Sequence, residues 1–205
     1  MSEKTPKKNL FSRVSFNGFS PVILPVSPAA GSPQKNLTGS PRVARDIVAD
    51  LYNNIQRWND LHIKGSNIVK QIAVFKSDNP NKFTPELEDY TNALYEVVVS
   101  LVVYRNCFEN LTSQIKALSK LNKEKEILFI SLNGIELSNL VESISLAYRD
   151  EFKVKEHILE NIAHTKGKNE VMFYAASWTH QCNITSDVNF KLETLLVETG
   201  HRNFN

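Results

Sequence analysis

Cysteine is scarce in this chain, and proline is absent from most of it. The two cysteines, Cys107 and Cys182, lie in neither a CxxC pair nor a His-rich spacing. Such usage is typical of a reduced, intracellular protein without a structural metal. All eight prolines occur at or before Pro85, so the rest of the chain lacks the residue that most disrupts helices. We therefore expect a mostly helical chain.

Long apolar runs and catalytic motifs are missing as well. The sequence has no run of about 18 apolar residues and no apolar segment behind its basic N-terminus, which argues against a membrane span or a secretory signal. It also lacks a Gly-rich phosphate loop, GxSxG, HExxH and the kinase motif set. We predict no catalytic residue and no cofactor, and hence a protein that is not an enzyme.

The N-terminal stretch differs from the rest in composition. Residues 1–41 hold six of the prolines, with five basic residues against one acidic residue. Such a segment cannot bury enough apolar area to offset the entropy lost on ordering. We predict a disordered basic tail over 1–41, a helical domain over 42–202 and a short C-terminal end at 203–205. The tail favours acidic partners, but its charge is too sparse for a nucleic-acid arm.

Apolar residues after the tail follow a heptad spacing. A stripe from Ala44 to Phe75 predicts a helix of about 33 residues, with Gly65 as its weakest point. A turn at 78–81 ends this helix, and Pro85 opens a second one. The short connection makes the two helices antiparallel neighbours.

The second helix is apolar around much of its circumference. Val98, Val99, Val102 and Val103 broaden its apolar face, so more than one element must cover it. Bulky aromatic residues in its seam also favour a bundle with a third helix over a two-stranded coiled coil. The valine run locally favours a strand, but the long heptad register outweighs that preference. We place the end of this helix near Lys125 or soon after.

The remaining sequence predicts three more helices. A turn at 133–134 leads into a third long helix over 136–163, which Gly167 ends as a C-cap. Short helices over 170–181 and 186–199 follow. The predicted fold is therefore all-α, an antiparallel, coiled-coil-like helical bundle of three long helices and two short C-terminal helices.

Three histidines near the C-terminus raise the question of a metal site. No Cys or carboxylate recurs at ligand spacing beside His164, His180 or His201. Contacts with helix-end carbonyls, or packing beside Trp178, explain these histidines without a metal, and we predict none. Cys107 lies in the valine-rich helix and is interpreted as a small core residue.

Residues at the end of the last helix are candidates for contacting a partner. His201 and Arg202 follow Gly200, which is expected to end that helix in the left-handed conformation, and they have no evident core role. Further candidates for partner contact are Trp58, Trp178 and His180. Trp178 has an alternative role, which is to dock the last two helices on the third.

The tail contains five Ser/Thr-Pro dipeptides, the sites that proline-directed kinases phosphorylate. The candidate acceptors are Thr5, Ser20, Ser27, Ser32 and Ser40. Thr5 and Ser32 also have a Lys three residues later, as in the full consensus of cyclin-dependent kinases.

A short segment of the tail is similar to a cyclin-docking motif, in which a basic residue precedes Leu and Phe side chains that fill an apolar groove. The candidate docking residues are Lys8, Leu10 and Phe11. Thr5 lies at most roughly 18 Å from Leu10, whereas the flexible chain to Ser32 spans about 25 Å and extends further, so downstream acceptors suit a distant active site better. Motifs of this kind are also common in ordinary linkers.

Three local signatures stand out near the C-terminus, with two shorter matches upstream. They are ENIAHT at 160–165, WTHQ at 178–181 and LETLLVETGHR at 192–202, with AYR at 147–149 and Glu151. Together they resemble the cyclin-dependent kinase 2-interacting protein family. A weaker similarity spans 40–65, where the family has a helix with one Trp followed by a Leu, here Trp58 and Leu61. The middle of the chain and the tail depart from the family pattern.

The resemblance implies a nuclear, non-catalytic helical adaptor, with a cytoplasmic pool left open. Family members are associated with cyclin-dependent kinase 2 and the Cdc7 kinase at replication origins. They are also associated with the subunit that interacts with the replication-stress checkpoint kinase. A second role is as subunits of an AAA ATPase assembly that acts in replisome protein turnover and in maturation of the large ribosomal subunit, where the member pairs with a second small helical protein. A nucleic-acid-binding bundle is a third alternative, although the sequence does not favour direct nucleic-acid contact.

Overall fold

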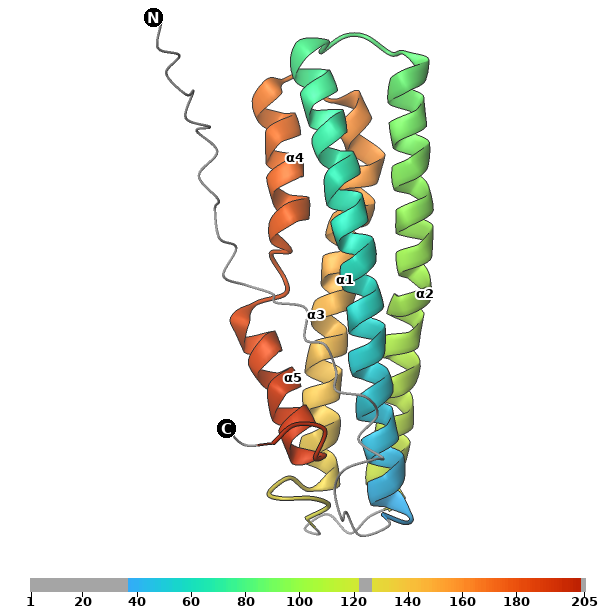
Figure 1. Ribbon diagram of the computed structural model, residues 1–205, viewed down its shortest axis with the longest axis vertical. Coiled ribbons are helices and arrows are strands. Elements are labelled where there is room, and N and C mark those ends of the chain that lie inside the picture. Colours follow the sequence, from blue (N-terminus) through green and yellow to red (C-terminus); the bar gives the residue numbers. More distant parts are fainter. Residues whose placement is uncertain (1–36, 122–126, 204–205) are drawn as a thin grey trace, which may run out of the picture. The chain divides into compact units, whose positions relative to one another are not determined.

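The structure is a computed structural model, and it describes residues 37–121 and 127–203. Its elements are α1 (Ser40–Asp78), α2 (Pro85–Leu121), α3 (Gly134–Asn161), the short 3₁₀ helix η2 (Ile162–His164), α4 (Lys168–His180) and α5 (Ser186–Glu198) (Figure 1). The predicted all-α bundle of three long and two short helices is confirmed. None of the helices within these ranges is both long and apolar enough to cross a membrane.

Four helical positions make up the bundle, and the fourth is shared by two short helices. α2 packs on α1 and α3, while α4 and α5 pack on α1 and α3 from the other side (Figure 1). Successive positions run in opposite directions, as the short connections require. We expected α4 and α5 to dock on α3, but α4 packs mainly on α1.

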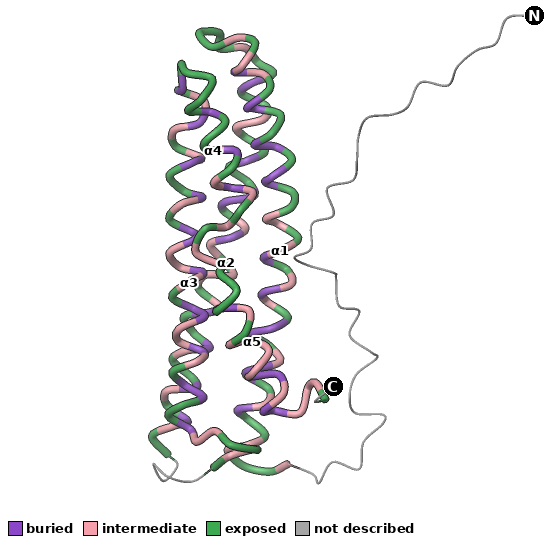
Figure 2. The backbone as a smooth tube through the Cα atoms, turned by 90° about the vertical axis from the view of Figure 1, so that its left-hand side faces the viewer, coloured by how far each residue is buried: buried purple, intermediate pink, exposed green. Residues whose placement is uncertain are grey.

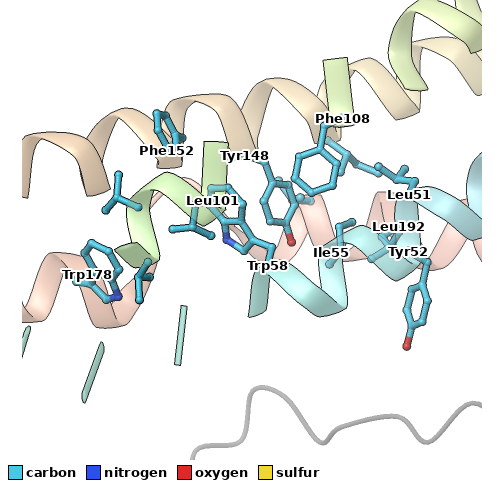
Figure 3. Packing of buried hydrophobic residues seen from close by; sticks show 14 of the residues in the cluster. Leu51, Tyr52, Ile55, Trp58, Leu101, Phe108, Tyr148, Phe152, Trp178 and Leu192 are labelled. Atoms are coloured by element: carbon cyan, nitrogen blue, oxygen red, sulfur yellow. The ribbon is translucent and has the colours of Figure 1, made fainter. Parts of the chain in front are cut away.

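Heptad seams place the apolar residues of the long helices inside. In Figure 2, buried and exposed residues alternate along each long helix. Trp58 of α1, Phe108 of α2 and Tyr148 of α3 meet at the centre of the core, with ring centroids between 4.9 and 6.1 Å apart (Figure 3). Aromatic residues of this size fill the interior of a bundle and bury a large apolar area. The seam in α1 is wider than predicted, because Val48, Ile55 and other residues beside it are also buried.

Helix ends differ from the sequence prediction at two places. Asn133 is the N-cap of α3, accepting hydrogen bonds from the backbone N–H of Ile135 and Glu136, so the helix begins two residues earlier than predicted. Gly167 does not end α3, since it has φ −101° and precedes α4. α3 ends sooner, through the 3₁₀ turn, where the Thr165 hydroxyl donates a hydrogen bond to the carbonyl of Ile162.

Boundary predictions at the tail and at the end of α2 fall partly outside the described residues. α1 begins at Ser40, inside the range predicted as tail, and the rest of that range from residue 36 backwards is not described. α2 is described to Leu121, and the predicted end near Lys125 lies in the undescribed stretch 122–126.

Candidate interaction surfaces

The indole of Trp178 anchors α4 on α1 at Gly65. A Cβ atom on Gly65 would lie 2.2 Å from Cζ2 of Trp178, so only glycine leaves room for the ring. The indole Nε1 donates a hydrogen bond to the carbonyl oxygen of His62 at 3.1 Å, and the hydroxyls of Ser66 and Thr179 share a hydrogen bond at 3.1 Å. The WTHQ signature thus begins with two residues that join α4 to α1.

Buried charges lie beside this joint. The Lys155 ammonium and the Glu151 carboxylate of α3 are 3.1 Å apart, and both side chains are fully buried. Lys155 also donates to Nδ1 of His62 at 3.2 Å and lies 4.4 Å from the centre of a Trp178 ring. The other Glu151 oxygen accepts hydrogen bonds from the backbone N–H and the side chain of Asn183, at 3.1 and 3.3 Å. One buried network therefore connects α1, α3, α4 and the segment that follows α4.

The pKa values in this network follow from its burial. Burial lowers the pKa of Lys155 to about 8, although Glu151 favours its charged form. Burial, together with the positive charges of Lys155 and Lys70, lowers the pKa of His62 to about 3. His62 is then neutral at pH 7, so its Nδ1 can accept a hydrogen bond from the Lys155 ammonium. Since Lys155 and Glu151 are fully buried, this network holds helices together and offers a solute no access to either charge.

Gln181 ends α4 and divides the fourth helical position. It has φ 45° and ψ 66°, the left-handed conformation that breaks a helix. Its side-chain oxygen accepts a hydrogen bond from Nε1 of Trp58 at 3.1 Å, which provides the buried indole with a partner. The sequence did not indicate this role for Gln181.

Trp58 and Trp178 lie inside the bundle and not on its surface. Both side chains are 0% exposed, and both indole N–H groups donate hydrogen bonds within the chain. A partner would have to open the bundle to reach either ring. We therefore correct the prediction that they contact a partner and assign them to the core.

Glu198 connects α5 to the segment that precedes α3. Its carboxylate accepts hydrogen bonds from the backbone N–H of Ile130, Ser131 and Leu132 at 3.0–3.3 Å, and also from the Ser131 hydroxyl. Burial alone would raise the pKa of Glu198, but these hydrogen bonds outweigh that effect and lower it. The charged carboxylate therefore holds the end of α5 to the segment that precedes α3.

The residues after α5 have structural partners that the sequence did not reveal. Gly200 has φ 70°, as predicted, and the N–H groups of Gly200 and His201 donate to the carbonyls of Val197 and Leu196, which is a Schellman ending. The Thr199 hydroxyl and Nδ1 of His201 are 2.7 Å apart. Arg202 forms an ion pair with Glu193 and lies over the ring of Tyr52 on α1. Partner contact by His201 and Arg202, both partly exposed, stays a prediction.

The other two C-terminal histidines are at separate places. His164 ends η2 and packs against the ring of Phe83, with centroids 6.3 Å apart, while His180 is exposed at the end of α4. Over 37–121 and 127–203, no three His, Cys, Asp or Glu side chains come together in a way that could hold a metal ion. Cys107 is only half-buried, and Cys182 is exposed.

An open pocket of about 480 Å³ lies where α2 begins and α3 ends. Leu87, Leu159 and Ala163 supply apolar atoms, and Phe83, which is 68% exposed, stands beside them. Glu88 and His164 add polar groups, and the full lining also includes Thr84, Pro85 and Thr91. Ala163 and His164 belong to the ENIAHT signature, so part of this signature lines a pocket that is open to other molecules.

A second candidate surface is the face of α2 that points away from α1 and α3. Tyr95, Val99 and Val103 follow one another at four-residue intervals on it and are 55%, 43% and 57% exposed. More than one element packs on α2, as predicted, since α1 and α3 both do, but Val99 and Val103, two of the valines behind that prediction, stay exposed. The described helices leave the third face open because α4 and α5 pack on the opposite side of the bundle (Figure 1).

The predicted tail sites lie almost entirely outside the described residues. These are the docking residues Lys8, Leu10 and Phe11 and the acceptors Thr5, Ser20, Ser27 and Ser32. Ser40 is described, and it is the first residue of α1, with Pro41 next to it. A phosphate on Ser40 would lie at the positive end of the helix dipole, where negative charge is stabilising.

Comparison with known proteins gives this architecture a family. No protein-family model matches the chain. The cyclin-dependent kinase 2-interacting protein of Mus musculus is 30% identical over an alignment of 195 residues that covers 81% of this chain and 92% of the mouse protein. The Homo sapiens protein of the same name is 28% identical with the same coverage, and that of Xenopus laevis is 24% identical over 86% of this chain and 97% of its own length. The resemblance inferred from residues 147–202 is thereby confirmed, and the chain belongs to the cyclin-dependent kinase 2-interacting protein family.

Proposed function

We propose that this protein is a nuclear, non-catalytic adaptor that binds cyclin-dependent kinase 2. The observation that carries the proposal is its similarity, over most of its length, to proteins named for interacting with that kinase. We propose two further partners. They are the Cdc7 kinase and the subunit that interacts with the replication-stress checkpoint kinase. In this role the protein brings kinases and checkpoint components together through protein contacts.

The arrangement of polar groups supports a role without catalysis. The buried charges Glu151 and Lys155 are paired with each other and have no exposed surface. Their neighbour His62 has its Nδ1 occupied by Lys155. General acid–base or nucleophilic catalysis requires such groups to reach a substrate. What the described part of the chain offers to other molecules is apolar surface, at the Phe83 pocket and on α2.

The tail supplies the contact with the kinase in this proposal. Lys8, Leu10 and Phe11 have the chemistry to dock in the apolar groove of a cyclin, and the Ser/Thr-Pro sites that follow are suited to phosphorylation by the docked kinase. Tethering raises the effective concentration of an acceptor at the active site when the linker spans the two sites. Ser32 meets this requirement better than Thr5, since a longer chain separates it from the docking residues.

A second candidate function is that of a structural subunit in an AAA ATPase assembly, paired with a second small helical protein. The open Phe83 pocket and the uncovered face of α2 favour it, because both belong to the bundle and remain available when the tail is engaged. A nucleic-acid-binding bundle has less support. The described residues carry 17 Lys and Arg against 19 Asp and Glu, whereas nucleic-acid binding needs an excess of positive charge.

Affinity purification from dividing cells tests the two main candidates. We compare the intact chain with a variant carrying Lys8→Ala, Leu10→Ala and Phe11→Ala. A matched control carries Arg13→Ala, Phe16→Ala and Phe19→Ala, which removes the same kinds of side chain from the same tail. We expect the first variant alone to lose cyclin and cyclin-dependent kinase 2, with any ATPase subunits retained.

Two outcomes would contradict the adaptor proposal. If the purified chain fails to bind a purified cyclin–kinase complex in calorimetry, kinase binding is not its function. If the docking variant binds as well as the control, the tail is not the docking site. A salt titration of DNA binding checks the third alternative, which requires at least micromolar affinity near physiological salt.

A further inference from the structure

The outer face of α2, defined by Tyr95, Val99, Val102 and Val103, is more apolar than a solvent-facing helix surface requires. Three of these side chains are 43–57% exposed, and Val102 is half-buried. From Val97 to Tyr104 the helix has no charged residue on any side. β-branched residues have lower helix propensity than the Lys, Glu or Ala common on exposed helix faces. Valine at these positions therefore lowers helix propensity and is only partly buried in the isolated chain.

Charges along α2 are divided by this apolar stretch. The four charged residues before it are all acidic, and three of the four after it are basic. Before it lie Glu86, Glu88, Asp89 and Glu96, and after it lie Arg105, Glu109, Lys116 and Lys120. The helix is therefore acidic in its first part, apolar in the middle and mainly basic towards its end.

We propose that the outer face of α2 is a self-association surface, on which the α2 helix of a second copy of this chain packs antiparallel. An antiparallel pairing brings the acidic part of each helix to the basic part of the other, whereas a parallel pairing would bring like charges together. The same apolar patch then meets itself at the centre. A two-fold axis generates this arrangement, because each copy offers the same surface to the other.

Heptad spacing fixes the register of this pair. Val102 lies midway between Glu88 and Lys116, two heptads from each. When the two-fold axis passes through the position of Val102, this valine faces its own counterpart and Val103 lies beside the axis. Glu88 then faces Lys116 of the second copy, and Tyr95 covers the stem of Glu109 of the second copy. In this register no acidic side chain faces another one.

Lys116 has a second carboxylate available in the dimer. In the single chain its ammonium lies 2.5 Å from Glu142 of α3, with both side chains partly exposed. Glu88 of the second copy would approach from the open side, so that the ammonium lies between two carboxylates. The exposed apolar patch is smaller than the roughly 800 Å² per partner of a standard interface, so we expect micromolar or weaker affinity.

Sedimentation equilibrium of the full chain, from about 5 to 500 µM, measures the association directly. We expect a monomer–dimer equilibrium that is lost when Val99→Glu and Val103→Glu are combined. The matched control is Phe190→Glu on α5, since Phe190 is 71% exposed and apolar and α5 packs on α1 and α3 on the side away from α2. Circular dichroism and the Tm of each variant establish that the helices remain folded.

Charge exchange tests the register. Glu88→Lys should weaken the dimer about fivefold, because two symmetric surface ion pairs are lost, and Lys116→Glu should do the same. The two changes together should restore most of the affinity. A chain that stays monomeric over the whole range overturns the proposal, and so does a dimer that the Val99 and Val103 changes leave intact.

Crosslinking tests the symmetry. In a chain with Cys107→Ser and Cys182→Ser, Val103→Cys places one thiol beside the two-fold axis, and mild oxidation should link two copies rapidly. Phe190→Cys in the same background is the control. Linking of Val103→Cys that is no faster than that of the control would overturn the antiparallel arrangement. If the chain is monomeric, this face would be available to bind a helix of a different protein.

Discussion

Gly65 shows how one residue decides whether two helices can approach. In a long helix a glycine costs about 1 kcal/mol relative to alanine, so the sequence marks this position as a weakness. The structure gives the compensation, because the Trp178 ring occupies the space where a side chain would be. The buried indole gains apolar contacts and a hydrogen bond to His62 that a larger residue at position 65 would prevent.

Gly65→Ala should destabilise the protein in spite of its better helix propensity. A Cβ 2.2 Å from an indole carbon forces the ring or the helix to move. Overpacking of this kind costs about 1–3 kcal/mol, and urea unfolding measures it. Gly167→Ala is the control, since its nearest neighbour would be 3.9 Å away. Equal or greater stability of Gly65→Ala would show that α4 does not pack on α1 as described.

His62 gives the protein a sensitivity to mild acid. Its pKa is about 3 in the folded chain against 6.5 in a model peptide, so between these values the unfolded chain binds a proton that the folded chain does not. Stability should therefore fall as pH drops below 6.5, by up to about 1.4 kcal/mol per pH unit. His62→Gln should lose this slope in urea unfolding measured at several pH values.

Glu198 provides the contrast in the same experiment. Its pKa is lowered from 4.5, so its contribution is complete above 4.5 and is lost as pH falls through the lower folded value. Glu198→Gln should therefore alter the profile only at the acidic end. A slope between pH 6.5 and 5 that His62→Gln leaves unchanged would contradict the assignment to His62.

At the scale of elements, the joint between α1, α3 and α4 contains a buried ion pair in place of an apolar contact. Such pairs add little stability relative to a well-packed apolar core, but breaking one leaves a buried charge without a partner. The pair also has secondary contacts that orient it, from Asn183 to Glu151 and from Lys155 to His62. These contacts fix how α4 and the segment after it lie on the bundle.

Glu151→Gln alone should destabilise the protein by about 3–5 kcal/mol, since Lys155 keeps its buried charge and loses its carboxylate. Combining it with Lys155→Met removes the charge and should recover most of this loss. Guanidinium unfolding of the two single variants and the double variant gives the coupling energy. Additive effects in the double variant would contradict the pairing.

Local patterns in the sequence predicted the helices but not how the short ones dock. Heptad seams predicted α1 and α2 because a repeat is visible in a single stretch of chain, the turn at 133–134 marked the start of α3, and Gly200 was recognisable as a helix end. The hydrogen bond from Lys155 to His62 joins residues 93 positions apart, and the one from Trp178 to the His62 carbonyl joins residues 116 positions apart. No local signal marks such pairs, so Lys155 was not recognised as buried, and Trp58 and Trp178 were named as candidates for partner contact, with a docking role as the alternative for Trp178. The Phe83 pocket was missed for the same reason, because its walls come from α2 and α3.

At the scale of the whole molecule, the region from Asn36 onwards forms one compact unit with its own core. The core cluster consists of residues from all five α-helices and η2. The sites proposed for kinase docking lie before this unit, and the surfaces proposed for other proteins lie on it.

Removing residues 1–35 should leave the bundle intact. Its Tm should change by no more than about 2 °C, because the described residues from Ala44 to Leu196 form a core cluster among themselves. Binding to a purified cyclin–kinase complex should be lost at the same time, while the oligomeric state stays as in the full chain. Differential scanning calorimetry and calorimetric titration measure the two effects. A large fall in Tm would show that the tail contributes to the fold.

Because α4 ends at Gln181, α4 and α5 are held on the bundle by two separate sets of contacts. Trp178 and the Lys155 network hold α4, whereas Glu198 and Arg202 hold α5 and the residues after it. A premature stop just after Asn183 would remove α5 with its contacts and retain the residues that hold α4. Such a stop would still uncover the core residues that Leu192, Leu195 and Leu196 of α5 help to bury, whereas a stop before Trp178 would remove both sets of contacts.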